Sequence, residues 1–118
     1  MNKEDYVSLE VAKLLKEKGF DEDCMAFYTR DGLFECNSYI NTNVLKHPTP
    51  TLYEAQKWLR EEKCLHVEIS YYCNNCYGYD ILTIPRHDLI GLADRRSTMY
   101  KIYEEALNAG ILEALKLI

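Results

Sequence analysis

The apolar residues of this chain follow two different spacings, and the order in which these spacings alternate restricts the fold more than any other feature. Three segments carry apolar residues every three or four positions, as amphipathic helices do: residues 8–18, 51–63 and about 97–118. The two segments between them, residues 24–36 and 65–84, are typical of paired strands joined by short turns. The predicted order of elements is therefore α-ββ-α-ββ-α.

Local signals mark the ends of the first two helices. Ser8 is placed to cap the first helix, and Gly19 supplies the left-handed residue that ends many helices. Thr51 and Glu54 have the spacing of a capping box, in which each side chain bonds the backbone amide of the other residue. We expect the second helix to begin at Thr51.

The third helix is predicted to begin near residue 97 or 98. Gly110 lies inside it and costs roughly 1 kcal/mol relative to Ala in helix propensity, so we expect this position to allow close packing. The predicted apolar face consists of nine residues: Met99, Ile102, Tyr103, Ala106, Leu107, Ile111, Ala114, Leu115 and Ile118.

Asp31-Gly32 favours a two-residue turn in the first hairpin, because such turns need positive φ at both central positions. This turn places Tyr28, Arg30 and Glu35 on the outer face. The predicted buried face pairs Thr29 with Phe34, Phe27 with Cys36 and Met25 with Ser38.

The second hairpin turns at Asn74-Asn75, and two registers fit its sequence. A two-residue turn pairs Ile69 with Asp80, whereas a loop one residue longer pairs Ile69 with Ile81. Two hairpins joined by a helix predict a single α+β domain over residues 1–118. We expect about four mainly antiparallel strands in one sheet, with the helices packed on one face.

Charge and composition exclude several functional classes. The formal net charge is −5, which argues against the dense basic face that nucleic-acid binding requires. The beginning of the chain has no signal-peptide pattern, and no apolar run approaches the roughly 18 residues of a membrane span. The odd count of five cysteines argues against a secreted disulfide framework. We therefore expect a cytoplasmic protein that binds neither nucleic acid nor membrane.

Three helical segments carry a resemblance: residues 7–20 (VSLEVAKLLKEKGF), 50–60 (PTLYEAQKWLR) and 103–118 (YEEALNAGILEALKLI). Together they resemble small uncharacterised proteins encoded by gut Bacteroides and by their phages and mobile elements. The resemblance implies a prokaryotic or phage cytosolic setting. It implies no activity, cofactor or site residue.

Two motifs allow catalytic or metal chemistry. Cys73 and Cys76 have the CxxC spacing that can hold zinc, but the chain offers no second CxxC for the other two ligands. Cys64 with His66, or Cys24 with Cys36, would have to supply them. His87-Asp88 could pair an imidazole with a carboxylate in a small hydrolase, although no nucleophile motif accompanies it. A zinc-supported domain and a hydrolase around His87 are the two alternatives to the main prediction, which includes no cofactor.

The main prediction comes from the tyrosines, of which the chain has ten. Four of them, Tyr71, Tyr72, Tyr77 and Tyr79, surround the second turn, and a two-residue turn would set Tyr72 directly opposite Tyr77. Tyrosine offers a large contact area at a low entropy cost and is enriched at binding sites. We therefore predict a non-catalytic binding or accessory protein that contacts another protein, or a second copy of itself. The predicted contact residues are Tyr72, Asn74, Asn75, Tyr77 and Tyr79.

Overall fold

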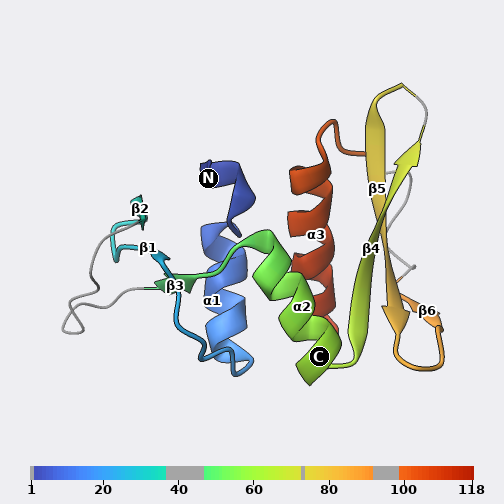
Figure 1. Cartoon of the computed structure of the whole chain (residues 1–118), viewed down its shortest axis with the longest axis horizontal. Helices are drawn as coiled ribbons and strands as arrows, with labels where there is room; N and C mark the ends of the chain where they lie inside the picture. The colour runs from blue at the N-terminus through green and yellow to red at the C-terminus, as the bar shows by residue number, and fades with distance from the viewer. Residues whose placement is uncertain (1, 37–46, 73, 92–98) are drawn as a thin grey trace.

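The computed structural model describes residues 2–36, 47–72, 74–91 and 99–118 (Figure 1). It has an α+β fold. Its helices are the short 3-10 helix η1 (Lys3–Asp5), α1 (Leu9–Glu17), α2 (Leu52–Glu62) and α3 (Tyr103–Lys116). Its strands are β1 (Ala26–Tyr28), β2 (Phe34–Cys36), β3 (His47–Thr49), β4 (Leu65–Tyr72), β5 (Cys76–Thr83) and β6 (Leu89–Ile90).

The two hairpins belong to separate sheets, so the expectation of one sheet of about four strands is wrong. One antiparallel sheet has the order β2-β1-β3 and the other has the order β4-β5-β6. Each hairpin acquires a third strand, β3 or β6, from a segment outside the predicted elements. Pro48 lies within β3, at the edge of its sheet, which is where a residue without a backbone N–H is tolerated.

The three α-helices lie between the two sheets, rather than on one face of a single sheet (Figure 1). α3 packs on β4 and β5, α2 packs on β4 and α3, and α1 packs on α3 and β3. Their apolar faces form one buried core with the strands. The largest fully buried side chains in it include Leu15, Leu59, Ile81, Ile111 and Leu115.

The predicted helix caps are confirmed. The backbone N–H of Val11 donates to the Ser8 hydroxyl oxygen over 3.3 Å. Thr51 and Glu54 form both bonds of a capping box, at 2.8 and 3.1 Å. Gly19 has φ 105°, which ends α1 as expected.

The first hairpin differs from its prediction by one residue of register. Tyr28, not Thr29, lies opposite Phe34, because the turn contains three residues in place of two. The Gly32 N–H donates to the Thr29 carbonyl oxygen over 2.9 Å and Gly32 has φ 86°, as in a type I turn followed by a left-handed glycine. Tyr28, expected on the outer face, is buried, because β1 is the central strand of its sheet and is covered on both faces. Met25, which was expected inside, precedes β1 and is 69% exposed.

The remaining residues of this hairpin have mixed outcomes. Phe27 is buried as predicted, because β1 is the central strand of its sheet and all three of its residues are buried. Cys36, predicted to be buried, is exposed. Ser38 lies outside the described residues.

In the second hairpin both predicted registers are wrong. Ile69 pairs with Tyr79, and the last pair before the turn is Tyr72 with Cys76. Three residues of chain thus separate the strands, of which Asn74 and Asn75 have φ of 62° and 57°. The tips of β4 and β5 extend past the first turn of α3 (Figure 1).

α3 begins at Tyr103, about one and a half turns later than predicted. Tyr100, in the segment before the helix, instead bridges to Tyr77 of β5. Met99 and Ile102, expected on the apolar face of the helix, are consequently exposed.

Candidate functional site

The register of the second hairpin decides which tyrosines share a face. Tyr71, Tyr77 and Tyr79 alternate in step with the buried Val67 and Ile81, so they lie on the face that α3 covers. Near the turn, the strands continue beyond the helix (Figure 1). On this face the hairpin is therefore buried under α3 at Val67 and Ile81, and it reaches solvent at the tyrosines nearest the turn.

Five tyrosines are linked by ring contacts and by one backbone bridge. The ring centroids of Tyr71 and Tyr77 are 5.4 Å apart, and those of Tyr77 and Tyr103 are 5.8 Å apart, both in edge-to-face geometry. Tyr79 and Tyr100 contact each other at 6.4 Å. We call Tyr71, Tyr77, Tyr79, Tyr100 and Tyr103 the tyrosine cluster. Its outer members are open to solvent, with Tyr71 60% and Tyr103 42% exposed.

Backbone hydrogen bonds fix the cluster in place. Tyr77 and Tyr100 exchange two of them, from the N–H of each to the C=O of the other, at 2.7 and 2.8 Å. Tyr77 therefore directs its N–H and C=O away from β4, which makes Tyr71 and Tyr77 a non-hydrogen-bonded pair. In such a pair the two side chains approach most closely. The segment before α3 is thus tied to the hairpin by its backbone, and Tyr103 at the start of α3 contacts the hairpin through the Tyr77 ring.

Tyr72 lies on the opposite face of the sheet. A Cβ built on Gly78 would come within 2.7 Å of its Cε2 atom, so the Tyr72 ring crosses over the glycine backbone. Tyr72 is 41% exposed. The expected Tyr72–Tyr77 pair does not form, since Tyr72 pairs with Cys76 and Tyr77 with Tyr71.

The five predicted contact residues are therefore divided between three places. Tyr77 and Tyr79 belong to the cluster, Asn74 and Asn75 are exposed at the turn, and Tyr72 faces away. The sequence analysis missed Tyr71, Tyr100 and Tyr103. The pairing of Tyr71 depends on the loop length, and the position of Tyr100 depends on a contact between segments far apart in the chain.

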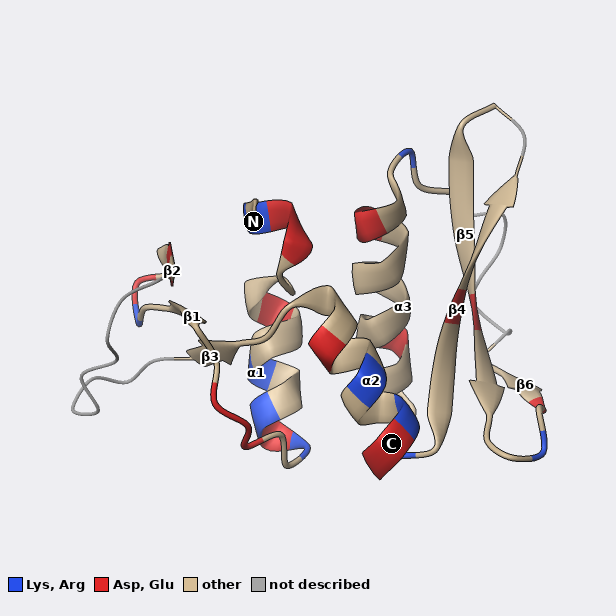
Figure 2. Ribbon diagram, in the orientation of Figure 1, with Lys and Arg blue, Asp and Glu red and all other residues tan. Residues whose placement is uncertain are grey.

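The distal part of the hairpin carries no charge. No Asp, Glu, Lys or Arg occurs from residue 69 to residue 79. Figure 2 shows the ends of β4 and β5 near the turn in tan, with one red band farther along each strand. The acidic residues of these two strands are Glu68 in β4 and Asp80 in β5. Glu68 and Asp80 lie directly opposite each other and mark where the uncharged part begins.

A hollow of about 480 Å³ borders the cluster. Tyr103 lines it together with Tyr53 at the start of α2 and Leu107 of α3. Tyr53 is exposed. Aromatic side chains thus surround the N-terminal end of α3 on two sides.

The cysteines predicted as zinc ligands are not gathered by the described part of the fold. Cys76, beside the turn, donates its thiol to the Asn74 carbonyl oxygen at 3.4 Å, and Cys73 lies outside the described residues. Cys64 precedes β4 and therefore lies at the opposite end of this hairpin. Cys24 is buried beside the other sheet, where burial raises the pKa of its thiol to about 12. Among the described residues no three metal-ligating side chains come together.

His87 lies in the exposed turn that joins β5 and β6. Its backbone N–H donates to the Thr83 carbonyl oxygen over 2.8 Å, and its φ is 64°. Asp88 pairs with Arg86, with 3.2 Å between its Oδ2 and the arginine Nε, and not with His87. This geometry gives no support to a hydrolase site at His87.

Comparisons of the chain with protein-family models, with curated proteins and with solved structures found no match. The resemblance of the helical segments stays a prediction. In the ranges that the structure covers, no helix is long and apolar enough to cross a membrane.

Proposed function

We propose that this chain is a non-catalytic binding protein that contacts another protein, or a second copy of itself, through the tyrosine-bearing end of the β4–β5 hairpin. The observation that carries the proposal is the chain of edge-to-face contacts from Tyr71 through Tyr77 to Tyr103, whose outer rings are 60% and 42% exposed. Asn74 and Asn75 at the turn and Tyr72 on the other face border this surface.

The physical argument concerns what this surface gains when it is covered. A tyrosine ring removes a large apolar area from water, and its hydroxyl keeps a polar contact at the rim. Rings held against each other have already lost most of their side-chain freedom, so a partner has little left to immobilise. Because residues 69–79 carry no charge, covering them desolvates no ionised group.

The outer edge of β4 adds a second means of attachment. β4 is an outer strand of its sheet. The Val67 carbonyl accepts a bond from Gln56 Nε2 at 2.7 Å, which shows that odd-numbered residues direct their backbone groups away from β5. Ile69 and Tyr71 therefore present theirs at the edge, where a strand of a partner could pair.

Affinity capture with matched variants tests the proposal. Tagged wild-type protein, a Tyr71→Ala/Tyr103→Ala variant and a Met25→Ala/Leu33→Ala variant are each incubated with bacterial lysate and with untagged copies of the same chain. The control removes two exposed apolar side chains from the first hairpin and the segment before it. Circular dichroism establishes that all three proteins are folded.

We expect a protein, or the untagged copy, to be retained by the wild type and by the control and lost by the tyrosine variant. Equal retention by all three proteins, or retention by none, contradicts the proposal. A parallel Tyr72→Ala variant shows whether the opposite face contributes.

A further inference from the structure

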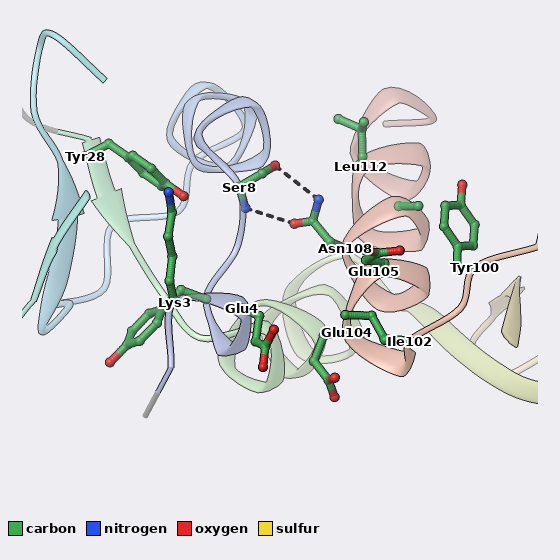
Figure 3. A pocket seen from close by; sticks show the side chains of 12 residues that line it. Lys3, Glu4, Ser8, Tyr28, Tyr100, Ile102, Glu104, Glu105, Asn108 and Leu112 are labelled. Atoms are coloured by element: carbon green, nitrogen blue, oxygen red, sulfur yellow. Dashed lines mark hydrogen bonds between the residues drawn. The ribbon is translucent and has the colours of Figure 1, made fainter. Parts of the chain in front are cut away.

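A groove of about 600 Å³ lies between the N-terminal segment and the start of α3, apart from the exposed side of the tyrosine cluster (Figure 3). Its volume is within the range of roughly 300–1,000 Å³ that is typical of ligand sites. Tyr28 and Tyr100 lie at its two ends in Figure 3. Its lining is largely apolar and aromatic, with Tyr6, Tyr28, Tyr100, Ile102, Ala109 and Leu112.

The floor of the groove is braced by a pair of hydrogen bonds. The Ser8 N–H donates to Asn108 Oδ1 at 2.9 Å, and Asn108 Nδ2 donates to the Ser8 hydroxyl oxygen at 3.1 Å (Figure 3). Ser8 also caps α1, so the pair ties the beginning of α1 to the middle of α3. The groove is therefore held open by a fixed framework.

The charges around the groove determine the chemistry of an occupant. Three carboxylates line it: Glu4 on η1, and Glu104 and Glu105 on α3. Within the described residues none of them lies at ion-pair distance from a lysine or arginine. Lys3 also lines the groove, but its ammonium group lies over the Phe34 ring, 5.9 Å from the ring centroid. The groove therefore combines aromatic walls with an excess of negative charge.

We propose that this groove binds a basic peptide segment, in which an arginine or lysine side chain faces the carboxylates and a neighbouring apolar side chain enters between the tyrosines. A guanidinium group pairs with carboxylates and also stacks on aromatic rings, so it matches both parts of the lining. An acidic segment is repelled by the three glutamates. This site is independent of the exposed tyrosine cluster apart from Tyr100, which contributes to both.

Amide NMR titrations with a defined probe test the assignment. The probe is the peptide acetyl-Leu-Arg-Leu-Arg-amide, and its controls replace both arginines by citrulline, which has the same shape without charge, or by glutamate. The protein is tested as wild type, as Glu104→Gln/Glu105→Gln and as Glu61→Gln/Glu62→Gln. The last variant removes the same charge from the exposed end of α2. A Glu4→Gln variant removes the carboxylate that η1, rather than α3, contributes to the groove.

We expect the arginine peptide to shift the amide signals of Ser8, Tyr100 and Asn108, and to bind at least about threefold more weakly to the Glu104/Glu105 variant, as loss of exposed ion pairs predicts. The Glu61/Glu62 variant is expected to bind like the wild type, and Glu4→Gln to bind more weakly than it. Binding should weaken as salt is raised from 0.05 to 0.5 M, because exposed charges are screened.

If the protein binds the citrulline peptide as tightly as the arginine peptide, the proposal is overturned. It is also overturned if the Glu104/Glu105 and Glu61/Glu62 variants lose the same affinity, because that result would indicate only general attraction to an acidic protein. Shifts located away from the groove also overturn it. Neither Tyr71 nor Tyr103 lines the groove, so the Tyr71→Ala/Tyr103→Ala variant should still bind the arginine peptide. Failure of the groove proposal is thereby distinguished from failure of the proposed tyrosine surface.

Discussion

Replacement of Gly110 by alanine tests how closely α3 approaches the second sheet. An alanine Cβ at this position would lie 2.5 Å from Val67 Cγ1 and 3.0 Å from Tyr79 Cγ. Val67 is fully buried and its side chain is stiff, and Tyr79 Cβ, 3.1 Å from the added methyl group, cannot move without the strand. The helix must therefore shift away from the sheet to accommodate one methyl group.

Two opposing terms set the size of the effect. Alanine is favoured over glycine inside a helix by about 1 kcal/mol. Overpacking a tight core costs roughly 1–3 kcal/mol, and contacts with two rigid groups place this case in the upper part of that range. We therefore expect the free energy of unfolding to fall by about 1–2 kcal/mol, measured by urea denaturation followed by circular dichroism.

Two further variants separate the clash from other effects. Gly78→Ala places a Cβ 2.7 Å from Tyr72 Cε2, but this ring is partly exposed and can rotate away, so we expect a smaller loss. In Gly110→Ala/Val67→Ala the opposing methyl group is absent, and the double variant should be more stable than the sum of the single effects by about 1 kcal/mol. If Gly110→Ala stabilises the protein, as helix propensity alone predicts, the close packing of α3 on β4 is refuted.

Three more predictions concern single side chains. Burial raises the pKa of the Cys24 thiol from its ordinary value of 9.0 to about 12, so the unfolded chain loses this proton first as pH rises. The urea midpoint should therefore fall as the pH is raised from 9 toward 12, and less steeply in Cys24→Ala. The same burial should make Cys24 react much more slowly with iodoacetamide at pH 8 than the exposed Cys36 and Cys64, as peptide mass spectrometry can measure. Tyr28→Phe removes the buried bond from its hydroxyl to the Val7 carbonyl oxygen and should lower the free energy of unfolding by about 1–2 kcal/mol in urea denaturation, whereas Tyr53→Phe, at an exposed position, should leave it unchanged.

The parts of the fold that sequence reasoning predicted well are those decided within a few residues. The capping box of Thr51 and Glu54, the Ser8 cap and the glycine at the end of α1 need no information from elsewhere in the chain. The hairpins themselves were also recognisable from their turn residues. Their registers were not, because one additional loop residue changes the partner of every strand residue.

The same difference between local signals and strand register applies to the candidate site. Tyr77 and Tyr79 could be selected from their position beside the turn, but Tyr71 replaces Tyr72 as the partner of Tyr77 only because the loop has three residues. Tyr100 joins the cluster through a backbone bridge between positions 77 and 100, and no local pattern predicts such a contact. The strand β3 contains Pro48 and pairs with β1 rather than with its sequence neighbour β2, and β6 has only two residues. Neither strand has a local signal like the Asp31-Gly32 turn, from which β1 and β2 were predicted.

Site-specific photo-crosslinking tests the central claim most directly. A benzophenone amino acid is placed at Tyr71 in one protein and at Leu33, an exposed position of the first hairpin, in another. Each is irradiated in bacterial lysate and at increasing concentrations of pure protein. We expect a discrete adduct from position 71 and none from position 33, and the mass of the adduct identifies a second copy or a different protein. Adducts of equal yield from both positions, or none from position 71, would contradict the assignment of the tyrosine cluster as a contact surface.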